Sequence, residues 1–210
     1  MQCPVRPYWT VPYQLKDCLK SQPLFRIFAK AGYNVALVAR NADSLEKLAE
    51  EIQGTGGEPF LELTAEEIQE SVNTNIIAAF AFAREAITLF KGLELDDKGK
   101  RGTLLFTGAT ASLRGNTTTS AIAAGKFGVR ALSQSLAKEF GKENIHVAHA
   151  IIDGGILTGR ARSYVPQEKL ENPDALLNPE SIGNSYLYLV NQDRSAWTWE
   201  LDLRPAHEKW

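Results

Sequence analysis

The sequence predicts an α/β fold built on a mainly parallel sheet, and two patterns support this prediction. Short apolar runs at 35–39, 103–106 and 145–152 are typical of strands that are buried on both faces. Between these runs lie longer stretches whose apolar residues recur at steps of three and four, as on the buried face of a helix. Strands that alternate with helices in this way form a parallel sheet covered by helices.

The first clear strand and helix lie between residues 33 and 54. Val35–Ala39 predicts a buried strand, and the helix that follows has Asn41 or Asp43 as its cap and Gly54 just past its end. A further strand is expected at Glu58–Glu62.

Residues 1–31 do not fit this alternation. They contain no glycine, and prolines at positions 4, 7, 12 and 23 divide them into pieces too short for a helix or a central strand. We expect an irregular segment, in which Tyr8–Val11 could supply one strand.

Two long helices are predicted in the middle of the chain. The first, from Ala65 to Phe90, has one apolar face and Gly92 as its terminator. The second, from Thr118 to Phe140, has an unusually small first half, with Ala121, Ala124, Gly125 and Gly128. Small side chains allow another backbone to approach closely, so we expect tight packing on this face.

The remaining elements continue the alternation. Ile145–Ile152 predicts a strand that runs into the turn Asp153-Gly154-Gly155, where glycine permits a positive φ or the close approach of a ligand. After a loop, Asn178-Pro179-Glu180 has the cap, the proline and the acidic first turn that begin a helix to about Val190. Trp197–Leu203 alternates apolar and polar residues, which predicts a half-buried strand.

Length and charge restrict the class of protein. A chain of 210 residues with 44% hydrophobic content can bury one sizeable core but is short for two, so we expect a single domain over 1–210. The formal net charge of -2 gives no electrostatic reason to expect nucleic acid or an anionic membrane as a partner. We expect a small-molecule substrate or other proteins instead.

Targeting signals are not evident. The longest apolar run, 76–83, is far shorter than the roughly 20 residues of a membrane span. Residues 1–10 lack the continuous apolar core of a secretory signal, so we expect a cytoplasmic protein. In that compartment Cys3 and Cys18 are expected to be reduced thiols.

Several segments resemble the short-chain dehydrogenase/reductase family in its single-domain form. Phe28–Arg40 is similar to the family's first crossover helix and second strand, Ser120–Ala137 to its active-site helix, and Ile145–Thr158 to its sixth strand and the loop over the nicotinamide. With Glu66–Phe90 these segments cover roughly two thirds of the chain, and their order is more specific than any one motif. The resemblance implies a Rossmann-like, doubly wound, mainly parallel sheet.

The amino-terminal half departs from the family pattern. Relatives hold the cofactor's pyrophosphate with three spaced glycines, and the corresponding positions here are Leu15, Leu19 and Ser21. The chain also passes from Glu62 almost directly to the helix at Ala65, without the family's next helix and fourth strand. Because the first and fourth strands are the central pair, we expect a sheet that is incomplete at its centre.

The resemblance also assigns catalytic positions. The family uses a Tyr as general acid and base, a Lys four residues later, a Ser about thirteen residues before the Tyr and an Asn on the preceding long helix. The Asn corresponds to Asn75, the Lys to Lys126 and the Tyr position to Ile122. The Ser position falls on Ala109, although a slip of one residue brings Thr110 there. Because Ile122 has no titratable proton, we expect activity to be impaired or lost.

The cofactor implied by the resemblance is NADP. Arg40 stands where NADP-preferring relatives place a base for the 2′-phosphate. Lys126 matches the family's contact to the nicotinamide ribose, and Gly154, Ile156 and Thr158 lie in the segment that closes over the nicotinamide. The alternative is that these residues have no role in binding. They would then be ordinary structural residues: a surface arginine (Arg40), a solvated lysine (Lys126), a turn glycine (Gly154), a core isoleucine (Ile156) and a loop threonine (Thr158).

We expect no metal site. His146 and His149 are three residues apart on a strand, which points them to opposite faces, and no third ligand accompanies them. Trp197 and Trp199 are expected to pack in the core or at a subunit interface rather than to stack on nucleic-acid bases.

Three interpretations of function remain open. The first is an NADP-dependent oxidoreductase of small carbonyl or alcohol substrates with impaired activity. The second is a non-catalytic member of the family that forms a homo-oligomer through helices 65–91 and 118–140. The third is a truncated or mis-assembled gene product, because the family pattern is lost before Phe28 and after Glu62.

Overall fold

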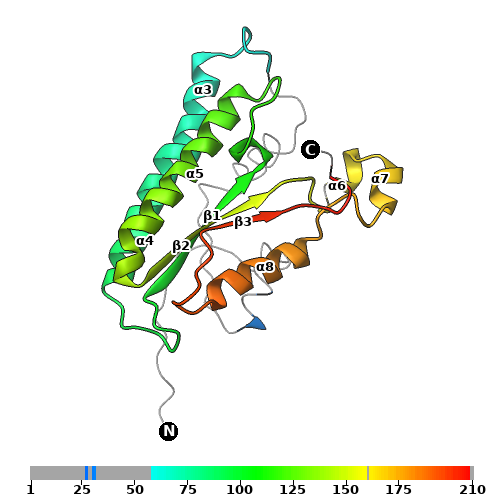
Figure 1. Cartoon of the computed structure of the whole chain (residues 1–210). Helices are drawn as coiled ribbons and strands as arrows, with labels where there is room; N and C mark the ends of the chain where they lie inside the picture. Colours follow the sequence, from blue (N-terminus) through cyan, green and yellow to red (C-terminus); the bar gives the residue numbers. More distant parts are fainter. Residues whose placement is uncertain (1–26, 28–29, 32–57, 160, 209–210) are drawn as a thin grey trace, which may run out of the picture.

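A sheet of three parallel strands lies at the centre of the fold (Figure 1). The computed structural model describes residues 58–159 and 161–208, together with residues 27, 30 and 31. Within this part of the chain the strands follow the order β1-β2-β3, and all of them are parallel.

The three strands differ in how far they are paired. β1 (Gly102–Ala109) pairs with β2 (Ile145–Ile152) along its whole length. β3 (Glu200–Leu203) pairs with β2 only from His149 onward. Among the described residues no strand lies on the other side of β1, which agrees with the expectation of a sheet that lacks its central pair.

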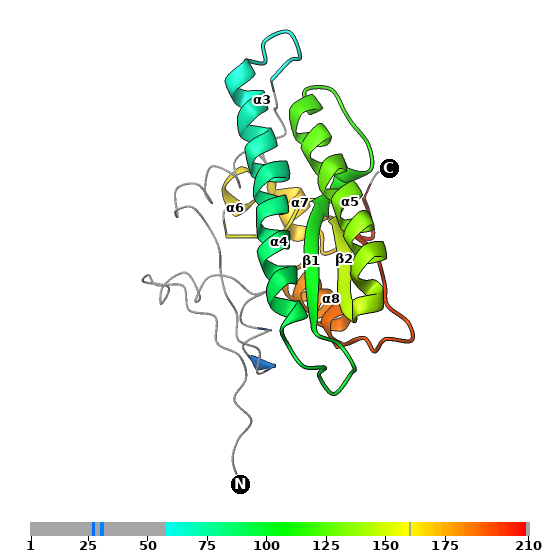
Figure 2. The same ribbon diagram turned by 90° about the vertical axis from the view of Figure 1, so that its left-hand side faces the viewer.

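Helices cover both faces of this sheet (Figures 1 and 2). On one face α3 (Ala65–Val72), a π-helical turn η2 (Asn73–Ile77) and α4 (Ala78–Lys91) form one continuous rod beside α5 (Ser120–Phe140). α8 (Pro179–Asn191) covers the opposite face. This layering confirms the α/β class predicted from the alternation of strands and helices.

Four short elements join these layers. The 3₁₀ turn η3 (Thr110–Ser112) follows β1, and the 3₁₀ turn η4 (Gly141–Glu143) leads from α5 into β2. Two short helices, α6 (Ala161–Tyr164) and α7 (Gln167–Glu171), lie in the segment that the sequence predicts to be a loop.

Local side chains set where the helices begin. Thr64 and Glu67 form a capping box at the start of α3, because Thr64 Oγ1 accepts from Glu67 N at 3.2 Å and Glu67 Oε2 accepts from Thr64 N at 2.8 Å. The predicted cap at Asn178 is confirmed, since Asn178 Oδ1 accepts from Glu180 N at 2.8 Å.

The small residues of α5 lie against the π-helical turn η2. A Cβ atom on Gly125 would stand 2.8 Å from Cβ of Asn75, and one on Gly128 would stand 2.2 Å from Cδ1 of Ile76. A side chain at position 125 would have to displace Cβ of Asn75 and with it the helix backbone, whereas one at position 128 would displace the end of the Ile76 side chain. The glycines therefore allow the helices to approach this closely. The predicted tight packing on this face is therefore confirmed.

Two apolar clusters fill the spaces between the layers. The first lies between the sheet and the α4–α5 pair and contains Ala83, Ile87, Leu104, Phe106, Val129, Leu132, Ile145 and Val147. The second lies between the sheet and α8 and contains Ala148, Ala150, Ile152, Leu177, Ile182, Tyr186 and Leu189. Because β2 contributes to both clusters, all eight of its residues are buried, as the sequence predicts for a central strand.

Two strand predictions need correction. Glu58–Glu62 is not a strand but a turn, in which Glu62 N donates to Pro59 O at 2.8 Å. Pro59 lacks a backbone N–H for a strand ladder, and the apolar side chain of Leu61 is 93% exposed rather than buried in a sheet. The last strand begins at Glu200 instead of Trp197, because the carbonyl of Thr198 accepts a hydrogen bond from Nε2 of His146 at 2.9 Å.

Some predictions fall outside the described residues. These are the candidate strand Tyr8–Val11, the strand Val35–Ala39 and the helix after it, the three positions of the glycine loop, and most of the segment 1–31. At its end that segment is helical rather than irregular, because residues 27 and 30 are helical and Ala31 N donates to Ile27 O at 3.0 Å. Within the described ranges, no helix is both long enough and apolar enough to cross a bilayer.

Candidate functional site

Lys126 is held inside the fold rather than in solvent. Its side chain leaves the middle of α5 and is 9% exposed, and Nζ donates to the backbone oxygen of Thr107 near the carboxyl end of β1 at 3.3 Å. Burial lowers the pKa of the Lys126 amine below its usual value, because the charged form loses hydration. The result is a buried donor at the end of the sheet where parallel α/β folds bind their ligands.

Asn75 packs against Gly125, the residue that precedes Lys126 on α5. It belongs to the π-helical turn η2. Its Nδ2 donates to the backbone oxygen of Ser71 at 3.1 Å, while Ser71 Oγ donates to the backbone oxygen of Ala121 at 3.0 Å. The bond between Ser71 and Ala121 ties the α3–η2 rod to α5 one helical turn before Gly125.

Ile122 stands one helical turn before Lys126 and is half-buried. The sequence of α5 contains no Tyr, His or Asp, so this helix presents no acid of moderate pKa beside Lys126. A buried phenol does occur at Tyr186, whose OH forms a 2.8 Å hydrogen bond with Thr107 Oγ1. Burial raises the pKa of Tyr186 to about 12, and the residue belongs to α8 on the opposite face of the sheet.

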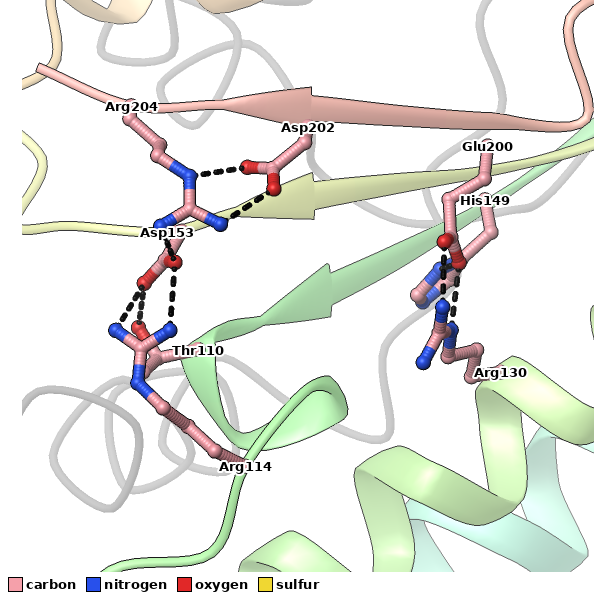
Figure 3. Close-up of polar contacts among 8 residues, drawn as sticks. All are labelled: Thr110, Arg114, Arg130, His149, Asp153, Glu200, Asp202 and Arg204. Carbon is pink, nitrogen blue, oxygen red and sulfur yellow. Dashed lines mark hydrogen bonds and ion pairs between the residues drawn. The ribbon is translucent and has the colours of Figure 1, made fainter. Parts of the chain in front are cut away.

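The hydroxyl of Thr110 is engaged by a buried carboxylate. Thr110 Oγ1 donates to Asp153 Oδ1 at 2.5 Å, and the side chain of Asp153 is fully buried (Figure 3). Arg204 Nη1 lies 2.7 Å and Arg114 Nη1 lies 3.2 Å from Asp153 Oδ2. Asp153 therefore joins the segments that leave the carboxyl ends of all three strands. The backbone N–H of Ala109, the other candidate for the Ser position, donates to Ser112 Oγ at 3.1 Å.

The predicted cofactor-binding residues of the loop after β2 have local partners. Gly154 has a φ of +150°, and a Cβ there would stand 2.7 Å from Cδ of Pro205, so glycine is required. Ile156 forms an isolated bridge with Leu177, and Thr158 Oγ1 accepts from the backbone N–H of Ala161 at 3.0 Å. Arg40 lies outside the described residues.

An ion-paired cluster one helical turn after Lys126 on α5 was not predicted from the sequence. Arg130 Nε and Nη2 each lie 2.7 Å from a carboxylate oxygen of Glu200, in a bidentate arrangement (Figure 3). Glu200 Oε2 also accepts from Nδ1 of His149 at 3.0 Å. We call these three residues the Arg130–Glu200–His149 clamp, because they connect α5, β3 and β2.

The electrostatics of this clamp follow from burial and pairing. Burial alone would raise the pKa of Glu200, but hydrogen bonds from Arg130 and His149 outweigh this effect and lower it. For His149, burial lowers the pKa, and the bond to Glu200 offsets only part of that shift. His149 is therefore neutral near pH 7, with its proton on Nδ1 and a lone pair on Nε2.

The Nε2 atom of His149 faces a space left by a glycine. A Cβ on Gly108 would stand 2.4 Å from this atom and 2.7 Å from Oγ of the fully buried Ser112. Among the described residues His149 Nε2 has no hydrogen-bond partner. The missing side chain at position 108 thus makes room for the imidazole ring under α5.

One local signal in the sequence places Arg130 on the same helix face as Lys126, but it does not reveal the partners of Arg130. Arg130 follows Lys126 by four residues, which places both on one face of α5. The alternation in the last strand marks Glu200 as polar but does not reveal that its side chain faces a helix instead of water.

The described residues contain no group of three His, Cys, Asp or Glu side chains that could hold a metal ion. His149 faces Arg130 and Glu200, whereas His146 stacks on Trp197 with the ring centroids 4.9 Å apart. Both histidines therefore have structural partners.

Comparison with known proteins identifies a similar family. The family model for short chain dehydrogenases matches residues 54–169, which is more than half of the chain. A 3alpha-hydroxysteroid dehydrogenase of Mediterraneibacter gnavus is 29% identical over 148 residues, which are 68% of this chain and 56% of that protein. The chain thus spans little more than half the length of this curated relative.

Solved structures show the same fold. A short-chain dehydrogenase from Rhodopseudomonas palustris is similar with a TM-score of 0.59 and 30% identity, covering 90% of this chain and 82% of that one. An alcohol dehydrogenase from Thermococcus sibiricus complexed with 5-hydroxy-NADP has a TM-score of 0.66 at 19% identity, covering 89% and 92% of the two chains. At that level of identity the second structure supports the fold alone.

The buried His149 predicts a pH-dependent stability. Because burial lowers its pKa in the fold, the unfolded chain binds a proton more readily, and the free energy of unfolding falls as pH drops below about 6.5. His146 contributes in the same direction, since its pKa is also lowered by burial. Urea denaturation from about pH 7.5 to about pH 5.5 should therefore show a steady loss of stability.

Replacing His149 isolates its contribution to this loss of stability at low pH. His149→Gln keeps a donor for Glu200 but cannot titrate, so its stability should fall less over this range than that of the wild type. Equal slopes for wild type and His149→Gln would show that His149 does not titrate as the structure indicates.

Proposed function

Because this chain belongs to the short-chain dehydrogenase family, we propose that it is an NADP-linked oxidoreductase of small carbonyl or alcohol substrates with strongly reduced turnover. One observation carries the proposal. Helix α5 keeps the buried amine of Lys126 at the carboxyl end of β1 and places the alkyl side chain of Ile122 one turn before it. The ribose-binding position of the family is thus kept, while the position of its proton donor carries no acid.

The described residues fit the nicotinamide end of such a cofactor. The amine of Lys126 has three N–H donors, and one of them donates to the backbone oxygen of Thr107, so the others can donate to ribose hydroxyl groups. Asn75 packs beside it on Gly125. When bound, NADPH supplies a hydride to the carbonyl carbon of the substrate.

Reduction of a carbonyl also needs a proton on oxygen, and the neighbours of Lys126 supply it poorly. Ile122 has no proton to give, and Tyr186 is on the far face of the sheet with a pKa of about 12. The hydroxyl of Thr110 donates to Asp153 and does not ionise near neutral pH. Without a positioned acid, turnover should be lower by about 100- to 10,000-fold than with one.

Restoring the acid tests this proposal directly. Ile122→Tyr places a phenol one turn before the Lys126 amine and should raise the rate of NADPH oxidation with small ketones and aldehydes by about 100-fold or more. Ile122→Phe adds the same ring without the hydroxyl and should leave the rate at the wild-type level. The rates are followed by the absorbance of NADPH.

Cofactor binding is measured separately. NADPH titrations should give saturable binding to the wild type and to Ile122→Tyr, with a loss of affinity in Lys126→Met. Failure of NADPH to bind the wild type, or equal rates for the Tyr and Phe variants, would overturn the proposal.

An exposed apolar surface favours a second function, which is self-association. Large apolar side chains are at least 42% exposed on the rod formed by α3, η2 and α4 and on α5, at Ile68, Ile77, Phe80, Phe82, Leu89 and Phe127. The rod and α5 lie side by side on one face of the sheet (Figure 2). A surface with so many exposed apolar groups is typical of an interface, so we propose a homo-oligomer through helices 65–91 and 118–140.

Sedimentation of charge variants tests this self-association. Phe80→Glu combined with Phe127→Glu places two carboxylates on the proposed interface and should convert a wild-type oligomer into a monomer. Tyr188→Glu introduces the same charge at a position that is 57% exposed on α8, on the other face, and should leave the oligomer intact. A wild type that is monomeric at every concentration tested would exclude this function.

A further inference from the structure

A single peptide group of β1 lies between the amine of Lys126 and the ring of His149. Its carbonyl oxygen is that of Thr107, which accepts from Lys126 Nζ at 3.3 Å. The peptide group ends at the α-carbon of Gly108, and a Cβ there would stand 2.4 Å from Nε2 of His149. Because a peptide group is planar and only a few ångströms long, the amine and the imidazole are close neighbours.

Both side chains lie in a space that is nearly closed to solvent. His149 is fully buried, and Lys126 is 9% exposed. Two positive charges repel one another more strongly in such a space than in water, because little solvent screens them. The fold avoids this repulsion near pH 7, since burial lowers the pKa of His149 and keeps its ring neutral.

The titratable groups that face the His149 ring come from β3 and α5. Glu200 of β3 accepts from Nδ1 of the ring at 3.0 Å. Lys126 and Arg130 stand four residues apart on one face of α5, and Arg130 pairs with Glu200 in a bidentate arrangement (Figure 3). A proton added to the ring therefore brings a positive charge to a group in which cations already outnumber the carboxylate.

The Nε2 atom, which would receive this proton, has no carboxylate beside it. Among the described residues it has no hydrogen-bond partner at all. The polar group next to it is the hydroxyl of Ser112, whose Oγ already accepts from the backbone N–H of Ala109 at 3.1 Å. No anion on this side compensates the new charge, so the repulsion acts on the amine of Lys126.

We infer that protonation of His149 drives the amine of Lys126 from its place on β1. The amine relieves the repulsion by giving up its own proton or by turning toward solvent, and either change weakens its bond to the oxygen of Thr107. The site would then lose its hold on the nicotinamide ribose as the pH falls. This effect on NADPH rests on the proposed function, whereas the displacement of the amine does not.

NMR of the full chain labelled with ¹³C-lysine follows the amine without any cofactor. The Cε resonance of Lys126, identified by its absence in Lys126→Met, should shift between about pH 7.5 and about pH 5.5 with the midpoint of the His149 ring. In His149→Gln it should stay constant, because glutamine keeps a donor for Glu200 but does not titrate. Circular dichroism at each pH establishes that the proteins are folded.

NADPH titrations measure the consequence for the site. The Kd of the wild type should rise several-fold over this pH range, and that of His149→Gln should rise less. The 2′-phosphate of NADPH also titrates here, but it contributes equally to both proteins. His146→Gln is the matched control, because His146 is buried on the opposite face of β2 and stacks on Trp197, so this variant should keep the wild-type pH dependence.

The two measurements separate this inference from the proposed function. A Lys126 resonance with the same pH dependence in the wild type and His149→Gln would overturn the inference, whatever NADPH does. If the wild type does not bind NADPH at about pH 7.5, the proposed function fails and the resonance alone decides the inference. Equal pH dependence of the Kd in wild type and His149→Gln, or its loss in His146→Gln as well, would exclude control of NADPH binding by His149.

Discussion

The position of α5 on the sheet depends on the Arg130–Glu200–His149 clamp. Within the clamp, Glu200 bonds to both of the other residues. Its carboxylate therefore connects β3 to α5 through Arg130 and to β2 through His149. Bidentate pairing fixes the orientation of the Arg130 guanidinium as well as its distance. Because Lys126 precedes Arg130 by one helical turn, the same contact sets where the Lys126 amine meets β1.

The opposite side of α5 is fixed by shape rather than charge. Gly125 and Gly128 allow the π-helical turn to approach, which brings Asn75 against the helix. A π-helical turn is rare inside a long helix and is frequently found at functional sites. The candidate site thus has Asn75 packed closely against the helix that carries Lys126, and position 122 of that helix carries an alkyl side chain.

Local pattern was sufficient for much of this fold but not for its polar contacts. The mainly apolar run Ile145–Ile152 and the cap at Asn178 gave the right elements, because both depend on neighbouring residues only. The strand predicted at Glu58–Glu62 was wrong, because apolar side chains form a strand only where a sheet is available to cover them. The sequence predicts only that Glu200 lies on the polar face of a strand. Its partner Arg130 is seventy positions earlier in the chain, and no local pattern reveals a contact over that separation.

The most direct measurement is a double-mutant cycle between Arg130 and Glu200. Unfolding by urea of the wild type, Arg130→Met, Glu200→Gln and the double variant gives the coupling free energy of the pair. If the clamp holds α5 on the sheet, the coupling should be about 1–3 kcal/mol, and both single variants should also bind NADPH less tightly than the wild type. Additive effects on stability, with unchanged NADPH affinity, would show that the pair does not position the helix.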